Sequence, residues 1–169
     1  MTNLAAGGQA AQTDFRVLIV DDDPDMTAML VRHLEREDVA VVAAIGGQAA
    51  LNALASQEFD VVVTDLVMDR VGGLEVLAAA GRCRPTPRVI LMTAFGTLET
   101  AIEAMRQGAY DYLTKPFKLA EVTVAVRRAF DDHRLRRENE QLRAGRGARR
   151  QDRGREDPRC LGAHTSAPI

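Results

Sequence analysis

Five polar residues with complementary chemistry follow short apolar runs at four separate places in this chain. Asp21 and Asp22 follow VLIV, Asp65 follows VVVT, Thr93 ends VILMT, and Lys115 closes YDYLTK. Because the carboxyl ends of parallel strands lie side by side, we expect these side chains to share one cleft at that edge of a sheet. Three carboxylates, one hydroxyl and one amine in a shared cleft are suited to a divalent metal ion and a phosphoryl group.

The three carboxylates would repel one another without a cation. Two like charges about 4 Å apart repel by about 4 kcal/mol at an effective dielectric constant near 20. Hard oxygen ligands favour Mg²⁺ over zinc, and no His or Cys lies near them in the sequence. The alternative is that Asp22 and Asp23 merely cap a helix and Asp65 is a surface turn residue. The recurrence of acids at two strand ends favours the metal site.

Asp65 is the best candidate for a nucleophilic carboxylate, because it stands alone at its strand end. A carboxylate can accept a phosphoryl group as an aspartyl-phosphate. Lys115 would supply a positive charge and Thr93 a hydroxyl donor for the phosphoryl oxygens. The chain contains 20 Arg and only two Lys, which argues against the alternative of Lys115 as a solvated loop residue.

Alternating apolar runs and amphipathic segments predict the scaffold that positions these residues. The predicted strands are 16–20, 39–44, 61–64, 88–92 and 110–113, and helices are predicted at 24–37, after 47, at 73–80, between 96 and 108, and from 119. Strands that are apolar throughout and alternate strictly with helices are typical of a parallel sheet covered on both faces. With right-handed crossovers this is a doubly wound α/β fold.

Composition narrows the class of protein. The length of 169 residues fits about one domain, and no apolar run approaches the roughly 18 residues that a membrane helix needs. Residues 1–14 lack the features of a signal peptide and read as a disordered tail. Cys83 and Cys160 show no metal-binding or redox spacing, so we expect a reduced, cytoplasmic protein without a membrane partner. An arginine-rich segment, 127–159, follows an acidic globular part.

Five segments in the order VLIVDDDPD, DVVVTDLVM, GGLEVL, VILMTAFG and GAYDYLTKPF resemble the receiver domain of two-component response regulators. The resemblance covers about residues 15–132. It implies a flavodoxin-like sheet with strand order 2-1-3-4-5 and a signalling phosphoacceptor, not an enzyme that acts on other substrates. It further implies that a histidine kinase phosphorylates Asp65, and that Mg²⁺ is held by Asp21, Asp22, Asp65 and the backbone carbonyl of Val67.

The resemblance also implies a switch. Thr93 and Tyr112 would couple phosphorylation to the face made by the fourth helix, the fifth strand and the fifth helix. The Lys115–Pro116 peptide bond would be cis, which suits a tight turn before proline. Alternatively, period-two alternation places Tyr112 on the same side as Tyr110, with both rings packed under the last helices.

One loop departs from the family pattern. Such domains usually follow the phosphoacceptor with Met-Pro-Gly, but here the run is Met68-Asp69-Arg70. We expect a looser loop, in which Asp69 competes for Mg²⁺ and Arg70 contacts the phosphoryl group or a partner. The main site residues are intact, so altered rates are expected and not lost chemistry.

The segment after the receiver-like part reads as a helical linker at 133–143. Leu135, Asn139 and Leu142 fit heptad spacing with a polar central position, which predicts a short coiled coil. One heptad is too short to associate alone, so a homodimer would also use the face of the fourth helix, the fifth strand and the fifth helix. The alternative is a solvated, charged helix end. The linker resembles that of sigma-54-dependent activators of the nitrogen-regulation type, which indicates a role in transcription regulation.

The remaining residues, 144–169, are arginine-rich, lack periodicity and read as disordered. They contain no phosphate-binding GxxxxGK[ST] motif and no room for a DNA-binding helix pair, so direct DNA binding is not expected. We therefore expect a truncated or frame-shifted activator, or a stand-alone receiver.

Three other functions fit the sequence less well. A receiver fold that no longer takes phosphate would be a pure interaction module, which the intact Asp65, Thr93 and Lys115 oppose. A hydrolase of the haloacid-dehalogenase kind needs a second acid where this chain has Val67. A dinucleotide-binding site needs glycines where acids follow Val20.

Overall fold

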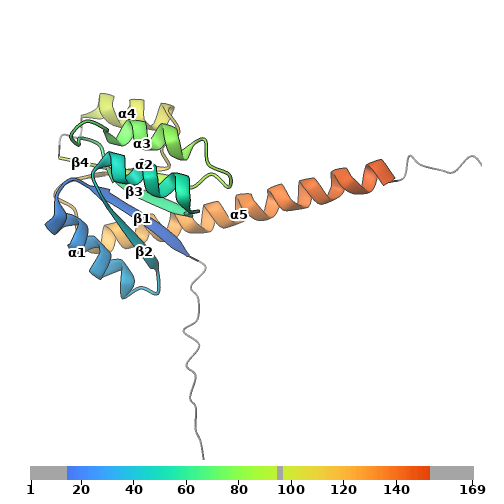
Figure 1. The fold of residues 1–169 in the computed structure, drawn as a ribbon, viewed down its shortest axis with the longest axis horizontal. Coiled ribbons are helices and arrows are strands. Elements are labelled where there is room, and N and C mark those ends of the chain that lie inside the picture. Colours follow the sequence, from blue (N-terminus) through green and yellow to red (C-terminus); the bar gives the residue numbers. More distant parts are fainter. Residues whose placement is uncertain (1–14, 95–96, 153–169) are drawn as a thin grey trace, which may run out of the picture. The chain divides into compact units, whose positions relative to one another are not determined.

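The computed structural model describes the backbone of residues 15–94 and 97–152. Five strands alternate with five helices in this part of the chain (Figure 1). They are β1 (Arg16–Asp21), α1 (Pro24–Glu35), β2 (Ala40–Ile45), α2 (Gly47–Ser56), β3 (Val61–Asp65), α3 (Gly73–Ala80), β4 (Arg88–Thr93), α4 (Leu98–Arg106), β5 (Asp111–Thr114) and α5 (Leu119–Asp152). The predicted alternation is confirmed.

The strands form one parallel sheet with the order β2-β1-β3-β4-β5. This order confirms the flavodoxin-like, doubly wound fold, in which the chain reverses its direction of winding beside β1. All strands point the same way, so the residues at their carboxyl ends meet at one edge of the sheet (Figure 1). The central strand β3 is buried along its whole length.

Alternate strand residues face two separate hydrophobic cores. On one face, Val17 and Ile19 of β1 pack with buried residues of α1 and α5. On the other face, Leu18 and Val20 pack with α2, α3 and α4. Because each central strand is covered on both faces, its sequence is apolar throughout instead of alternating. The three layers hold the sheet rigid behind its carboxyl edge.

Local signals explain where α1 begins. Asp23 is the N-cap residue, and its carboxylate accepts hydrogen bonds from the backbone N–H groups of Asp25 and Met26. Pro24 occupies the first turn, where its missing N–H costs nothing. Asp23 therefore serves the helix, which leaves Asp21 and Asp22 for the site.

One expectation about the tyrosines is wrong. Tyr110 packs against the core that contains α1 and α5, whereas Tyr112 packs against the core that contains α2, α3 and α4. Strand β5 begins at Asp111, so Tyr110 precedes the strand and period-two alternation does not apply to it.

Helix α5 continues to Asp152, past the predicted linker end at residue 143. Residues 144–152 hold two Ala, three Arg and one Gln, which favour a helix, and two Gly, which disfavour it. Adding turns to a helix that has already formed is easy, so α5 extends through this stretch although it lacks an apolar stripe. The expectation of disorder is therefore wrong for residues 144–152, and residues 153–169 lie outside the described part. The chain divides into two compact units, residues 1–135 and 136–169.

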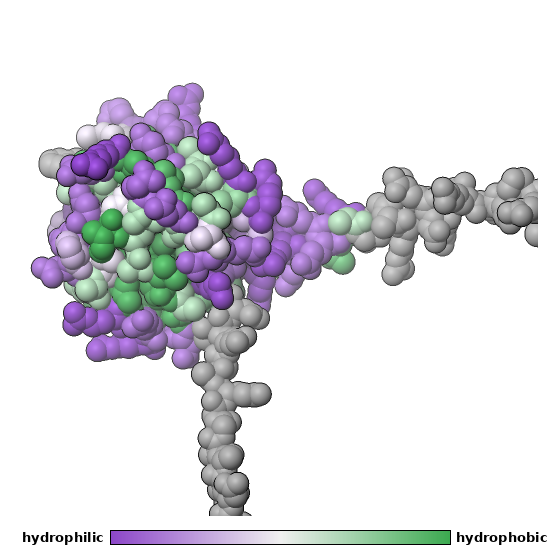
Figure 2. Space-filling view, in the orientation of Figure 1, coloured by the Kyte–Doolittle hydropathy of each residue, from purple (hydrophilic) through white to green (hydrophobic). Residues whose placement is uncertain are grey.

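The coloured, visible side of α5 in the second unit is mostly hydrophilic (Figure 2). Among the described residues, no helix combines the length and apolar character needed to cross a membrane.

Candidate functional site at the carboxyl edge of the sheet

Two buried aspartates stand at the ends of neighbouring strands. Asp21 is the last residue of β1 and Asp65 the last residue of β3, and they are 1% and 8% exposed. Each carboxylate has one oxygen fixed by a backbone N–H. Asp21 Oδ1 accepts from Asp23 N at 3.0 Å, and Asp65 Oδ1 accepts from Val67 N at 3.3 Å. The second oxygen of each carboxylate remains for other groups.

Lys115 joins these two carboxylates. Its ammonium nitrogen Nζ lies 2.8 Å from Asp21 Oδ2 and 2.9 Å from Asp65 Oδ2. Burial disfavours the charged ammonium, but the hydrogen bonds and charges of both aspartates outweigh it and raise the pKa of Lys115. The backbone N–H of Lys115 donates to Thr93 O at 2.7 Å, and the Lys115–Pro116 peptide bond is cis. The structure thus brings together residues 50 and 94 positions apart.

The carboxylates of Asp21, Asp22 and Asp65 form a set that fits Mg²⁺. One oxygen from each can be chosen so that all lie within 4.8 Å of one another. Three carboxylates and one ammonium leave two negative charges, which one divalent cation would balance. Hard oxygen donors at a partly open edge, where Asp22 is exposed, are the ligands that Mg²⁺ prefers. Asp69 lies outside this set.

Thr93 and Tyr112 belong to β4 and β5, the two strands that follow β3 in the sheet. Thr93 ends β4 and is fully buried. Tyr112 is half-buried, and its hydroxyl lies 3.2 Å from Thr100 Oγ1 at the start of α4. Either hydroxyl can be the donor in this contact, and Thr100 Oγ1 also donates to Thr97 O and accepts from Thr97 N. Tyr112 is thereby tied to the N-terminal cap of α4.

The loop after β3 lies at the surface. The Val67 side chain is 61% exposed, and its carbonyl as a metal ligand stays a prediction. Arg70 has a positive φ of 66°, a left-handed conformation that side chains with a β-carbon rarely adopt. Arg70 stands where the family pattern has glycine.

Two glycines that support the site were not recognised as functional from the sequence. A β-carbon on Gly73 would lie 2.3 Å from Asp65 O, and one on Gly47 would lie 2.1 Å from Val71 O. Gly73 thus lets α3 approach the phosphoacceptor candidate, and Gly47 lets α2 approach the loop after β3. Gly73 stands in the GGLEVL run and Gly47 in the pair Gly46-Gly47, but spacing alone does not reveal a close approach between backbones.

The predicted linker residues are not part of this site. Leu135 and Leu142 are 54% and 65% exposed, and Asn139 is also exposed.

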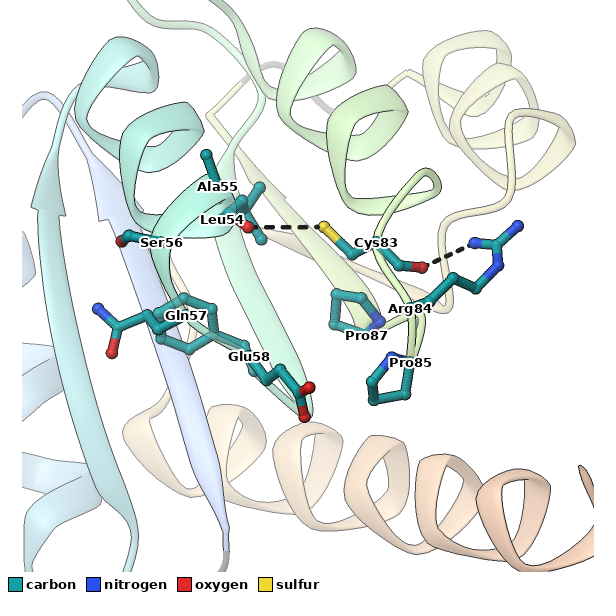
Figure 3. A pocket seen from close by; sticks show the side chains of 10 residues that line it. Leu54, Ala55, Ser56, Gln57, Glu58, Cys83, Arg84, Pro85 and Pro87 are labelled. Carbon is teal, nitrogen blue, oxygen red and sulfur yellow. Dashed lines mark hydrogen bonds between the residues drawn. The ribbon is translucent and has the colours of Figure 1, made fainter. Parts of the chain in front are cut away.

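A pocket of about 250 Å³ lies away from the site, between the loops that lead into β3 and β4 (Figure 3). The Cys83 thiol in its wall already hydrogen-bonds the carbonyls of Leu54 and Ala79. The pocket offers no converging set of acids.

A five-stranded doubly wound sheet with an acidic cluster and one lysine at its carboxyl edge defines a class of α/β signalling domains. Residues 17–127 match the family model of the response regulator receiver domain. The chain belongs to this family, whose members are phosphoacceptors in two-component signalling and not enzymes with a separate substrate.

The similarity to nitrogen-regulation activators is confirmed. The nitrogen assimilation regulatory protein NtrX of Azorhizobium caulinodans is 34% identical over 75% of this chain and 28% of its own length. The solved structure of NtrX from Brucella abortus in complex with ADP is 30% identical, with a TM-score of 0.70 over 75% of this chain and 29% of that one. The chain therefore spans just over a quarter of these two relatives.

A third relative bears on the site. A response regulator from Burkholderia pseudomallei, solved with a phosphorylated aspartic acid, a calcium ion and citrate, is 27% identical. It has a TM-score of 0.64 over 75% of each chain.

Proposed function

We propose that Asp65 accepts a phosphoryl group from a phosphohistidine of a sensor kinase, with Mg²⁺ held by Asp21, Asp22 and Asp65. The observation that carries this proposal is the joint contact of Lys115 Nζ with Asp21 and Asp65 beside the third carboxylate. The related protein solved with a phosphorylated aspartic acid and a calcium ion supports it. A reduced, cytoplasmic setting is the compartment we expect.

In the transfer, an oxygen of Asp65 forms a bond to phosphorus as the bond from phosphorus to the histidine nitrogen breaks. The histidine nitrogen leaves with its electron pair. Mg²⁺, when bound, neutralises charge on the phosphoryl oxygens. Val67 N holds Asp65 Oδ1, so Oδ2 is the oxygen that faces Lys115 and is suited to attack. Lys115 then pairs with the phosphoryl group, and the Thr93 hydroxyl donates to it.

Phosphorylation would act on α4, β5 and α5 through Thr93 and Tyr112. A Thr93 hydroxyl drawn to the phosphoryl group leaves space on the side of Tyr112. Movement of the ring into that space breaks its hydrogen bond to Thr100 and frees the cap of α4. The exposed Ile102, Met105 and Val124 lie on these helices and give the face an apolar surface for a second copy.

The linker would extend this dimer. Leu135 and Leu142 are exposed at heptad spacing with Asn139 between them, which suits a paired helix. One heptad is too short to associate alone, so the receiver face must contribute. An output in transcription regulation fits the relatives, whereas direct DNA binding by this chain is not proposed.

Acetyl phosphate, a small phosphodonor, tests the proposal without knowledge of the kinase. The chain is incubated with acetyl phosphate and Mg²⁺ and its intact mass is measured. We expect one added phosphoryl group in the wild type and none in Asp65→Asn or after chelation of Mg²⁺. Asp111→Asn, an acid on β5 away from the cluster, is the matched control and should be modified normally.

An unmodified wild-type mass, identical to that of Asp65→Asn, would overturn the proposal and favour the interaction module. Size-exclusion chromatography of the phosphorylated chain then tests the dimer. Earlier elution that Leu142→Glu abolishes is the expected result.

A further inference from the structure

The last turns of α5 in the first unit contact the amino edge of the sheet, opposite the acidic site. Residues at the amino ends of four strands reach this stretch of the helix. We name the contacts the amino-edge clamp, and its pairs are Phe15 with Phe130, Asp60 with His133, Arg88 with Asp132, and Tyr110 with the carbonyl of Arg128. The function proposed above uses none of these residues.

Asp60 is the centre of the clamp. It precedes β3 and is 9% exposed. Its backbone N–H donates to Arg16 O, and its carbonyl accepts from Arg88 N, so its main chain joins β1 and β4. Its carboxylate Oδ2 accepts from Arg16 N at 2.8 Å, and Oδ1 lies 3.1 Å from His133 Nδ1. Both carboxylate oxygens are therefore used, one on the sheet and one on α5.

Among the described residues, one polar contact, that with Asp60, connects His133 to the sheet. The residue is 4% exposed, and its Nδ1 must carry the hydrogen because its partner is a carboxylate oxygen of Asp60. The other ring nitrogen, Nε2, is buried and has no hydrogen-bond partner among the described residues. The Asp60 contact thus fixes the imidazole.

Arg88 and Tyr110 extend the clamp to the neighbouring strands. The guanidinium of Arg88 forms an ion pair with Asp132 and lies over the Tyr110 ring, 5.6 Å from its centroid. The Tyr110 hydroxyl donates to Arg128 O at 3.2 Å. The rings of Phe15, which precedes β1, and Phe130 of α5 stack with their centroids 3.9 Å apart. Aromatic and charged contacts therefore hold the same two turns.

Beyond the clamp the helix has little apolar burial. Every residue from Arg134 to Ala144 is exposed, although α5 is continuous to Asp152. A helix of this length is marginal on its own because its first turn is costly to form, whereas adding turns to a formed helix is easy. The exposed stretch therefore depends on the turn that precedes it, and His133 is the last buried residue of that turn.

We propose that His133, through its 3.1 Å contact with Asp60, is a positioning residue that keeps α5 helical through residues 134–144. This role holds whether or not Asp65 is phosphorylated, so its test needs no phosphodonor and can fail independently of the phosphoacceptor function.

Native-state amide hydrogen exchange of the full chain tests this role of His133. Two substitutions separate the hydrogen bond from helix propensity. His133→Asn keeps a donor at the position of Nδ1 but is a poorer helix former, whereas His133→Leu is a better helix former without a donor. We expect amides of residues 130–140 to exchange roughly tenfold faster in His133→Leu than in His133→Asn, because a hydrogen bond to a charged group is lost.

Arg127→Ala is the matched control. It breaks another contact that joins α5 to the rest of the domain, the exposed ion pair of Arg127 with Glu37. In Arg127→Ala, amide exchange at residues 130–140 should match that of the wild type. Amides of β1 should stay protected in every variant. Equal or slower exchange in His133→Leu than in His133→Asn would overturn the proposal. If His133→Leu does not fold, Asp60→Asn decides, since wild-type exchange at residues 130–140 in that variant would also overturn it.

Discussion

Gly73 lies directly against the main chain of Asp65, at the point where α3 begins. A β-carbon on residue 73 would stand 2.3 Å from Asp65 O and 2.8 Å from Leu66 Cα. Backbone atoms cannot move away as the end of a side chain can. The position of the phosphoacceptor candidate therefore depends on the absence of a side chain one loop further along the chain.

Gly73→Ala should destabilise the domain and displace Asp65. Overpacking of this kind costs about 1–3 kcal/mol, and the expected loss lies at the upper end because only backbone is available to shift. Urea unfolding measures the free energy, and the acetyl phosphate assay measures the rate at Asp65. Gly81→Ala is the control, because the nearest atom to a β-carbon there is at 3.5 Å. Equal stability of the two variants would contradict the close approach.

Lys115 should stabilise the fold in a pH window set by its own pKa. Although burial opposes the charge, hydrogen bonds to Asp21 and Asp65 raise that pKa above the ordinary value of 10.5. A raised pKa means that the folded state holds the proton more tightly, so the stabilisation is complete below 10.5 and is lost as the pH rises through the folded value. Lys115→Met should cost about 1–2 kcal/mol at pH 7, since charged hydrogen bonds at a partly exposed site are lost.

The difference between wild type and Lys115→Met should therefore stay constant from neutral pH to 10.5 and shrink above it. Urea unfolding at a series of pH values measures this difference. Lys118→Met is the matched control, because Lys118 is exposed and lies outside the cluster. A stability difference that grows above pH 10.5 would contradict a raised pKa of Lys115.

The sheet and the convergence of the acids were predictable because they depend on periodicity and strand direction. Apolar runs that alternate with helical stripes specify the parallel sheet, and its geometry then gathers Asp21, Asp65 and Lys115 at one edge. The exact ends of the strands are harder to predict from the sequence. A strand that begins one residue later no longer fixes the face on which the preceding ring lies. Tyr110 was misplaced for this reason.

Contacts between residues distant in sequence had no local signal. The pairing of Asp60 with His133 joins two segments 73 positions apart, and neither residue stands in a motif. The hydrogen bond between Tyr112 and Thr100 likewise depends on how α4 packs beside β5. The lack of an apolar stripe predicts too short a helix α5, because a helix that has already formed can continue into residues without one.

Arg70→Gly should stabilise the loop after β3. Arg70 has φ of 66°, and the left-handed conformation costs a residue with a β-carbon about 1–2 kcal/mol, part of which is offset by the greater freedom of glycine when unfolded. We expect a net gain of about 0.5–1 kcal/mol in the free energy of unfolding. Asp69→Gly is the neighbouring control. Asp69 does not have a positive φ, so this substitution should not raise the free energy of unfolding. Equal effects of the two substitutions would contradict a conformational cause.

Asp22 should contribute to Mg²⁺ binding although it is exposed. Its carboxylate belongs to the set of oxygens within 4.8 Å, whereas the exposed Asp25 only occupies the first turn of α1. Titration with Mg²⁺ should raise the melting temperature of the wild type by mass action, because the folded state alone gathers the ligands. Asp22→Ala should weaken the apparent affinity about tenfold or more, as expected when one of three charged ligands is removed. Asp25→Ala changes the net charge by the same amount, so an equal loss in both variants would mean that Mg²⁺ responds to overall charge and not to a site.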